Sequence, residues 1–202
     1  MYTAIAYAVV RFFCVGFLKI IYRVSVTGAE NVPKEGSLVI ACNHKNNIDP
    51  FFVASCTKRR IVFLAKIELF RNAALRFILN SVGAVSVNRD GNDLAVMKKS
   101  LSALKDGLAI GMFPEGQRIN DPDSELDLKP GAAMLAYRTQ SPIVPIYISG
   151  TYKLFTKMKV IVGEAFLLDK IDNKPNSEAY QKMADEQIKP RLAGLREMAE
   201  KA

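Results

Sequence analysis

The chain has 202 residues, of which 50% are hydrophobic and 24% charged, so it is long enough for one folded domain and too apolar for general disorder. Its three cysteines contain no Cys-x-x-Cys pair and its single histidine is His44, which argues against a disulfide framework and excludes a zinc site built on several histidines. The net charge is +8, and residues 1–60 hold eight Lys or Arg against three Asp or Glu. A basic front is compatible with nucleic acid, an acidic partner or an anionic membrane.

The amino-terminal segment is mostly apolar and long enough to span a bilayer, but Arg11 and Lys19 interrupt it. On a helical wheel Arg11, Lys19 and Arg23 lie on one side, and the rest of the wheel is largely apolar. This pattern predicts an amphipathic helix that lies in a membrane interface, rather than a spanning helix or a cleavable signal peptide. We therefore expect a membrane-interface helix at residues 1–26 and a folded domain at residues 27–202. A helix packed on the core of the domain is the alternative interpretation.

The rest of the chain alternates short apolar runs with segments of helical periodicity. In chain order, the predicted elements are a strand at 37–42, a helix at 50–56, a strand at 61–65, a helix at 68–80, a strand at 84–87, a helix at 93–105, a strand at 108–113, a helix at 131–138, strands at 143–149 and 160–162, and a helical segment at 177–199 that Pro190 interrupts or ends. This alternation is typical of an α/β fold. We expect a single mixed, mainly parallel sheet that helices cover on both faces.

Polar residues follow the first of these strands, at the edge where α/β sheets place ligand sites. Among them are His44 and Asp49, and the Pro50 that follows favours a helix start with Asp49 as its N-cap. A turn between strand and helix can bring Asp49 to one imidazole nitrogen of His44, which leaves the other nitrogen to take a proton from an alcohol. This pair is the base-and-orienter half of a Ser-His-Asp triad, with a substrate hydroxyl as the nucleophile. A turn histidine beside an N-capping aspartate is the alternative.

Two further blocks end strands with an arginine. Residues 113–118 follow one strand, where Gly116 lets the backbone approach a ligand closely and Arg118 offers a planar fork of donors for phosphate. Residues 85–89 end another strand at Arg89. Taken singly, each block is equally compatible with an ordinary turn or strand end that carries a solvated arginine.

Taken together, and in their order along the chain, the three blocks resemble the glycerophospholipid acyltransferase family, whose members include 1-acylglycerol-3-phosphate acyltransferases. The matches are Asn43, His44 and Asp49 for the family's Asn-His-x4-Asp motif, residues 85–89 for its arginine-ending second block, residues 113–118 for Phe-Pro-Glu-Gly-x-Arg, and residues 143–146 for a looser apolar-proline strand. The ordered set is specific even though no single block is.

The resemblance implies that residues 27–202 form an acyltransferase domain. His44, oriented by Asp49, would be the general base that deprotonates the free hydroxyl of 1-acylglycerol 3-phosphate, which then attacks an acyl thioester to give phosphatidate. The residues implied to bind substrate are Arg89 and Arg118, which would hold the phosphate, Glu115 and Gly116, which would shape its pocket, and Lys66, which would add a positive charge or equally be a solvated strand-end lysine. The implied donor is acyl-carrier protein or acyl-coenzyme A, and no metal or redox cofactor is required.

The same resemblance and the basic, apolar front predict a peripheral or monotopic protein on an anionic membrane surface, at the cytoplasmic face of the cell membrane. Glycerol 3-phosphate or another lysophospholipid stays open as the acceptor. A different class of function is a non-catalytic adaptor that binds anionic lipid, for which His44 would be dispensable. A nucleic-acid partner is disfavoured because the excess charge sits on an apolar helix, there is no tryptophan, and no known binding motif is present.

Overall fold

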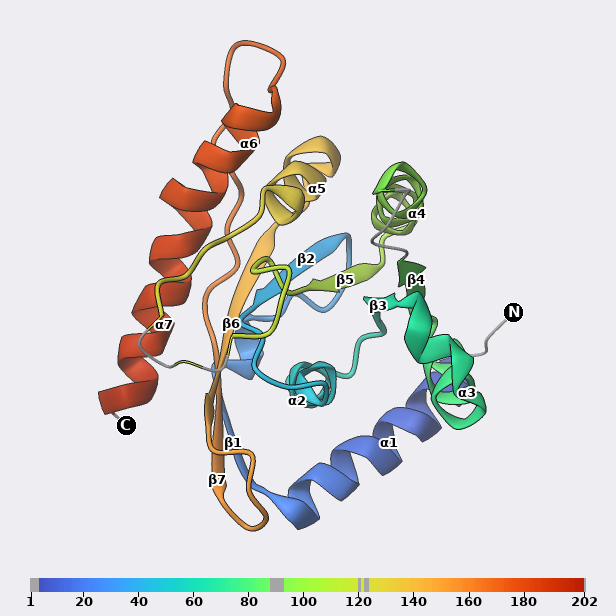
Figure 1. The fold of residues 1–202 in the computed structure, drawn as a ribbon. Coiled ribbons are helices and arrows are strands. Elements are labelled where there is room, and N and C mark those ends of the chain that lie inside the picture. Colours follow the sequence, from blue (N-terminus) through green and yellow to red (C-terminus); the bar gives the residue numbers. More distant parts are fainter. Residues whose placement is uncertain (1–3, 88–92, 120, 122–123, 202) are drawn as a thin grey trace.

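A computed structural model describes residues 4–87, 93–119, 121 and 124–201, and its centre is one seven-stranded sheet (Figure 1). The strands are β1 Arg23–Thr27, β2 Leu38–Cys42, β3 Ile61–Lys66, β4 Val85–Val87, β5 Ala109–Met112, β6 Ile143–Gly150 and β7 Lys157–Val162. Their order across the sheet is β1-β7-β6-β2-β5-β3-β4, and neighbours are parallel except β6 and β7. The expected fold, a single mixed and mainly parallel sheet with helices, is confirmed.

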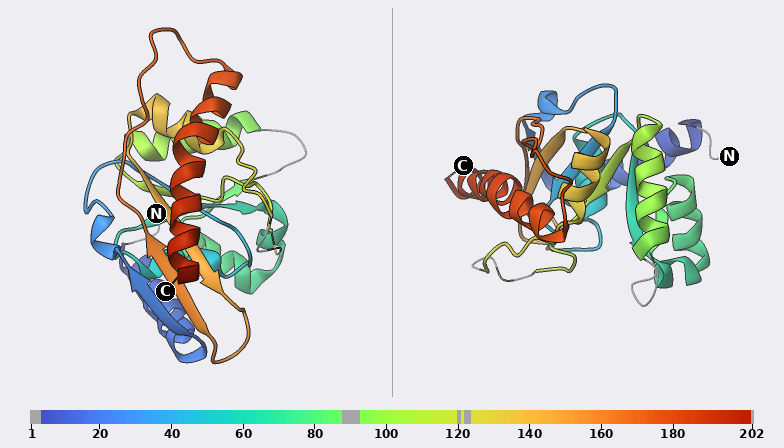
Figure 2. Two further views of the ribbon diagram at one scale, coloured as in Figure 1. Left: turned by 90° about the vertical axis from the view of Figure 1, so that its left-hand side faces the viewer. Right: turned by 90° about the horizontal axis from the view of Figure 1, so that it is seen from above.

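Helices cover both faces of the sheet (Figures 1 and 2). The helices are α1 Ala4–Ile21, α2 Asp49–Ser55, α3 Ala73–Ser81, α4 Asp93–Lys105, α5 Gly131–Thr139, α6 Ser177–Met183 and α7 Lys189–Lys201. Helices α1 and α2 lie on one face, α4 to α7 lie on the other, and α3 packs against α1. The central strand β2 is buried along its whole length because Leu38 and Ile40 enter one core and Val39 and Ala41 enter the other.

Two boundaries differ from expectation. The segment at 68–80 is a 3-10 turn, Ile67–Arg71, followed by α3, because the side-chain oxygen of Asn72 accepts the N–H groups of Ala74 and Leu75 and so starts a new helix. Strand β1 was not predicted, and it pairs with β7 at the edge of the sheet. The expected boundary between residues 26 and 27 therefore falls inside a strand of the sheet.

The carboxy-terminal helical segment is not ended by Pro190. Helix α6 continues through a π-helical turn, Ala184–Ile188, into α7. A proline nitrogen cannot donate a hydrogen bond, and a local change from α to π hydrogen bonding just before Pro190 lets the helix continue past it.

Helix α1 packs Arg11 inward and leaves a largely apolar side facing outward. The Arg11 Nε–H donates to the Ala54 carbonyl at the end of α2 (2.9 Å), where a basic side chain compensates unpaired carbonyls of the last turn. Leu18 and Tyr22 are buried on the same side. The apolar residues Ile5, Val9, Phe12, Phe13, Phe17 and Ile20 are exposed. The helical wheel predicted that Arg11 belongs to a basic stripe with Lys19 and Arg23. Arg11 instead points inward, so the prediction is wrong for this residue. Judged by length and hydropathy, no helix within the described residues could cross a bilayer.

Candidate active site

The turn between β2 and α2 brings His44 and Asp49 into contact. The His44 Nδ1 lies 2.9 Å from Asp49 Oδ2, and the same oxygen accepts the N–H groups of Lys45 and Asn46, each at 2.7 Å. The expected N-cap role of Asp49 is wrong, because Ile48 occupies that position and Asp49 is the first residue of the helix. From there its carboxylate points back into the turn and orients the imidazole instead of capping α2.

Asp49 is completely buried, and its second oxygen has a distant partner. Tyr152, 103 residues along the chain in the loop after β6, donates its hydroxyl to Asp49 Oδ1. These four hydrogen bonds offset much of the cost of burying the carboxylate in an apolar setting. Burial and the negative charge of Asp49 raise the pKa of Tyr152, so the tyrosine keeps the proton that it donates. No motif or spacing in the sequence indicated this contact.

The His44 ring is held from several sides. Phe113 stacks on it, with ring centroids 4.1 Å apart and planes 20° apart. The backbone N–H of His44 donates to Glu115 Oε2 (2.7 Å), and its carbonyl accepts the N–H of Ile119 (2.8 Å). The side chain is 18% exposed and lines a cavity. Within the described residues, Nδ1 of His44 binds Asp49 and no group forms a hydrogen bond with Nε2. A ligand in the cavity can therefore bind to Nε2.

Asn43, the asparagine of the Asn-His motif, has a structural role. Asn43 is buried, and its side-chain amide exchanges two hydrogen bonds with the backbone of Ile148 in β6, at 3.0 and 2.7 Å. These bonds continue the pairing of β2 with β6 by one side chain after the last backbone pair, Cys42 with Ile146. The end of β2, and with it the start of the His44 turn, is thereby fixed.

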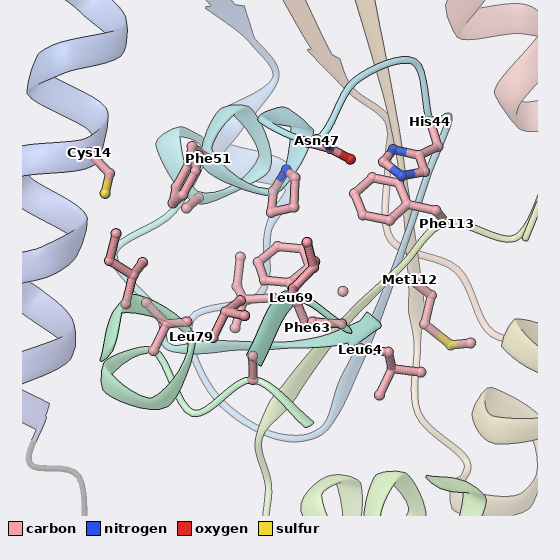
Figure 3. A pocket seen from close by; sticks show the side chains of 18 of the residues that line it. Cys14, His44, Asn47, Phe51, Phe63, Leu64, Leu69, Leu79, Met112 and Phe113 are labelled. Atoms are coloured by element: carbon pink, nitrogen blue, oxygen red, sulfur yellow. The ribbon is translucent and has the colours of Figure 1, made fainter. Parts of the chain in front are cut away.

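A cavity of about 1190 Å³ begins at His44 and runs between the sheet, α1 and α3 (Figure 3). This is above the range of about 300–1,000 Å³ of most small-ligand pockets. Its polar part is lined by His44, Gly116, Gln117, Arg118 and Lys129. Its apolar part is lined by residues that include Phe63, Leu69, Leu75, Leu79, Val10 and Cys14. Figure 3 shows His44 and Cys14 on opposite sides of the cavity. One site thus joins a polar region to a long apolar one.

Three of the expected substrate-binding residues are described. Arg118 is exposed, lines the cavity and forms no hydrogen bond or ion pair with any residue in the described part of the chain. Gly116 also lines it, and its φ of 70° is a conformation that residues with a Cβ rarely adopt. Glu115 does not shape this cavity. Its buried carboxylate faces away and braces the His44 backbone, and burial raises the pKa of Glu115. Arg89 and the side chain of Lys66 lie outside the described part of the structure.

Lys129 is a cation of the polar region that the sequence interpretation missed. Its backbone N–H donates to the Pro114 carbonyl (2.7 Å), which ties it to the Phe-Pro-Glu-Gly-x-Arg motif, and its ammonium forms an exposed pair with Asp127 (3.2 Å). The first residues of α5, Gly131 and Ala132, line the cavity beside it. A helix N-terminus presents unpaired N–H groups and a positive dipole end, so this region is suited to an anion. The available signal was a lysine just before a predicted helix start.

The cysteines do not provide a thiolate near His44. Burial raises the pKa of Cys14 at the far side of the cavity, and raises that of Cys56 in the core to about 12. Within the residues that the structure describes, no three His, Cys, Asp or Glu side chains gather closely enough to hold a metal ion. The geometry therefore places an oriented imidazole beside a cationic region of a large cavity.

A family model for acyltransferases matches residues 23–149, which contain His44, Asp49 and both arginine blocks. The chain belongs to the acyltransferase family. The 1-acyl-sn-glycerol-3-phosphate acyltransferase of Bacillus subtilis is 31% identical to this acyltransferase over 183 residues, which are 86% of this chain and 90% of the relative. The alpha form of that enzyme from Homo sapiens is 33% identical over 138 residues, 67% of this chain and 48% of the relative. The chain thus spans nearly all of the bacterial relative and about half of the human one.

The fold also has a counterpart among solved structures. The crystal structure of the 1-acyl-sn-glycerophosphate acyltransferase PlsC from Thermotoga maritima superposes with a TM-score of 0.69 at 23% identity, covering 93% of this chain and 78% of that one. The two proteins share a fold.

Proposed function

We propose that this acyltransferase moves a fatty acyl group from an acyl thioester to the free hydroxyl of 1-acylglycerol 3-phosphate, which gives phosphatidate in phospholipid biosynthesis. The observation that carries the proposal is the position of His44, oriented by Asp49, where the polar and apolar parts of one cavity meet. A lysophosphatidate has a phosphate head and an acyl tail on either side of its free hydroxyl, and this cavity has matching regions. The names of the relatives support the same acceptor.

In the proposed mechanism, His44 Nε2 accepts the hydroxyl proton as the substrate oxygen attacks the thioester carbonyl. Asp49 keeps the proton on Nδ1 and stabilises the imidazolium that forms. When the tetrahedral oxyanion collapses, the C–S bond breaks and the sulfur leaves with the proton from the imidazolium. The acyl group passes directly to the acceptor, so no covalent acyl-enzyme is needed.

The cationic region of the cavity binds the phosphate in this proposal. Arg118 and Lys129 supply charge, and the N-terminus of α5 supplies backbone N–H groups. Arg89 and Lys66 retain the substrate-binding roles that the family resemblance implies. The apolar region between α1 and α3 accommodates an acyl chain, whose burial there removes hydrocarbon from water.

Replacement of Arg118 by alanine is expected to raise the KM for 1-acylglycerol 3-phosphate by roughly ten-fold or more, because a charge-assisted contact to phosphate is lost. The KM for the acyl thioester should change little. Steady-state kinetics with each substrate varied in turn measures both. Lys170→Ala removes an exposed cation that does not line the cavity, and it should leave both values unchanged. Equal rises in the two KM values for Arg118→Ala would contradict the phosphate role.

Tyr152 is expected to act as a positioning residue through Asp49. Replacing it by phenylalanine removes one of the hydrogen bonds that hold the carboxylate, so kcat should fall by about two- to ten-fold while both KM values stay constant. Tyr180→Phe is the matched control, because its hydroxyl meets Arg138 on the other face of the sheet. A lower melting temperature with unchanged kcat would leave Tyr152 with a structural role alone.

We also propose that the enzyme is a peripheral or monotopic protein at the cytoplasmic face of the cell membrane. The outward apolar side of α1 and the exposed Lys19 and Arg23 beside it suit an anionic interface. Three free cysteines are typical of a reducing compartment. The acyl donor in this proposal is acyl-carrier protein or acyl-coenzyme A, and the reaction uses no metal or redox cofactor.

The deciding experiment combines the purified full chain with 1-acylglycerol 3-phosphate, glycerol 3-phosphate or a lysophosphatidylcholine, and with each of the two donor types. Mass spectrometry of the lipid product is expected to show phosphatidate only with the first acceptor. A product from glycerol 3-phosphate alone would favour the alternative acceptor. Binding to lipid vesicles without any acylated product would favour a non-catalytic adaptor.

A further inference from the structure

The turn between β6 and β7, residues 151–156, carries two exposed apolar side chains at its tip. Leu154 is 67% and Phe155 is 68% exposed. Phe155 has a φ of 62°, a left-handed conformation that is unfavourable for a bulky side chain. The turn therefore holds an aromatic ring in water at the expense of backbone strain. Two adjacent exposed apolar side chains gain nothing from packing in the isolated protein, and such a pair is suited to an external apolar contact.

The β6–β7 turn is attached to the end of α1, where the two lie side by side in Figures 1 and 2. The Phe155 N–H donates to the Ile21 carbonyl (2.7 Å), one of the last-turn carbonyls that lack a partner within the helix. The Arg23 N–H donates to the Thr156 carbonyl (3.0 Å), and the Thr156 hydroxyl donates to carbonyls of Thr151 and Lys153 inside the turn. These bonds join the turn to the end of α1.

The outward side of α1 continues this apolar surface along the helix. Its exposed apolar residues, here called the outer face of α1, are Ile5, Val9, Phe12, Phe13, Phe17 and Ile20. Their spacing of three, four or one residues places them on one side of the helix. Contiguous exposed apolar patches of this kind on a folded protein mark contacts with membranes or partner proteins.

The charges around the surface select the partner. Residues 4–27 and 151–163 contain no Asp or Glu. The exposed basic residues of this surface are Lys19, Arg23, Lys153 and Lys157. Arg23 and Lys157 are paired in register on β1 and β7, at the edge strand that leads from α1. A second copy of the chain would bring these like charges together, whereas an anionic bilayer offers opposite charge and an apolar interior.

We propose that Leu154 and Phe155 insert into an anionic phospholipid bilayer alongside the outer face of α1, so that the β6–β7 turn is a second membrane contact. A protein held at a bilayer by one helix alone can rotate about the axis of that helix, and a second contact beyond the end of the helix prevents this. The inner side of α1, with Val10 and Cys14, lines the apolar part of the cavity. The two contacts together hold that part of the cavity beside the bilayer. The inference rests on the proposed function only in that the acceptor is a membrane lipid.

The absence of tryptophan from the sequence makes insertion directly measurable. Phe155→Trp places a single tryptophan at the tip, and vesicles of phosphatidylglycerol and phosphatidylcholine, with or without brominated acyl chains, serve as the probe. On vesicle binding, the emission is expected to shift to the blue and to be quenched by the brominated lipid. Leu167→Trp is the matched control, since Leu167 is 62% exposed in the segment after β7 and away from α1, and its emission should not change.

A second pair of variants measures the contribution to binding. Leu154→Ser combined with Phe155→Ser should lower the partition coefficient onto these vesicles by about ten-fold or more, because two apolar side chains no longer leave water. Leu167→Ser combined with Met198→Ser removes two exposed apolar residues elsewhere and should have no effect. Turnover of a short-chain, water-soluble lysophosphatidate should stay at the wild-type rate in both variants.

Other results would overturn the inference. If the full chain sediments with vesicles while the tryptophan at position 155 keeps its aqueous emission, the turn does not insert, and membrane binding through α1 and the proposed acyl transfer stand. A blue shift that appears on raising the protein concentration without vesicles identifies a second copy as the occupant. Failure of the wild-type chain to acylate the soluble acceptor counts against the proposed function and leaves the vesicle measurement valid.

Discussion

Replacement of His44 by alanine is expected to lower the rate of acyl transfer by about 10²–10⁴-fold, the usual cost of removing a general base. Without the imidazole, no group of the Asp49 turn can take the hydroxyl proton from the acceptor. The side chain is partly exposed, and the backbone N–H that binds Glu115 is retained in the variant, so the fold should persist. Initial rates of phosphatidate formation, together with thermal unfolding, measure both effects.

Lys45→Ala is the matched control for His44. The Lys45 backbone N–H, which binds Asp49, stays in place, and its ammonium lies over the Tyr147 ring rather than in the substrate cavity. This variant should keep most of its turnover. Wild-type turnover in His44→Ala would remove the imidazole from the mechanism.

Replacement of Asp49 by asparagine is expected to lower kcat by roughly 10²-fold or more, with small changes in KM. The amide oxygen can still accept from His44, Lys45 and Asn46, and the Tyr152 hydroxyl can turn to accept from the new NH₂ group. The geometry is therefore retained, but the negative charge that stabilises the imidazolium is lost. Single-turnover rates and the melting temperature separate this effect from unfolding.

A double variant tests whether Tyr152 works through Asp49. If it does, adding Tyr152→Phe to Asp49→Asn should cost less than Tyr152→Phe costs in the wild-type chain, because the charge that the hydroxyl orients is already gone. Independent, multiplicative losses would show that the tyrosine acts on the reaction by another route.

Much of the fold follows from local patterns. The helix predicted at residues 93–105 matches α4, and the apolar run at 37–42 matches β2 to within one residue. The proximity of His44 and Asp49 could also be predicted from the sequence, since both residues belong to one strand–turn–helix unit. Strand β1 could not be predicted in this way. Its five residues alternate between exposed and half-buried positions at the edge of the sheet, so they do not form an apolar run.

The missed and corrected features of the site are contacts between distant segments. Tyr152 reaches Asp49 across 103 residues, and Asn43 binds Ile148 across 105. Glu115 belongs to the expected motif, but the packing of β2 beside β5 turns its carboxylate to the His44 backbone instead of the cavity. Sequence periodicity predicts which residues lie on the same side of a helix or strand. It does not predict which other segment that side packs against.

The sequence by itself determined the acyltransferase family, through the motifs that it carries in order. It also determined the alternation of strands and helices and the contact of His44 with Asp49, because strand and helix periods and turn chemistry act over a few neighbouring residues. Only the tertiary structure decided that α1 packs through Arg11 and leaves its apolar side outside, that the β6–β7 turn is bound to its end, and that Tyr152 completes the Asp49 site. These features depend on which distant surfaces meet when the core closes.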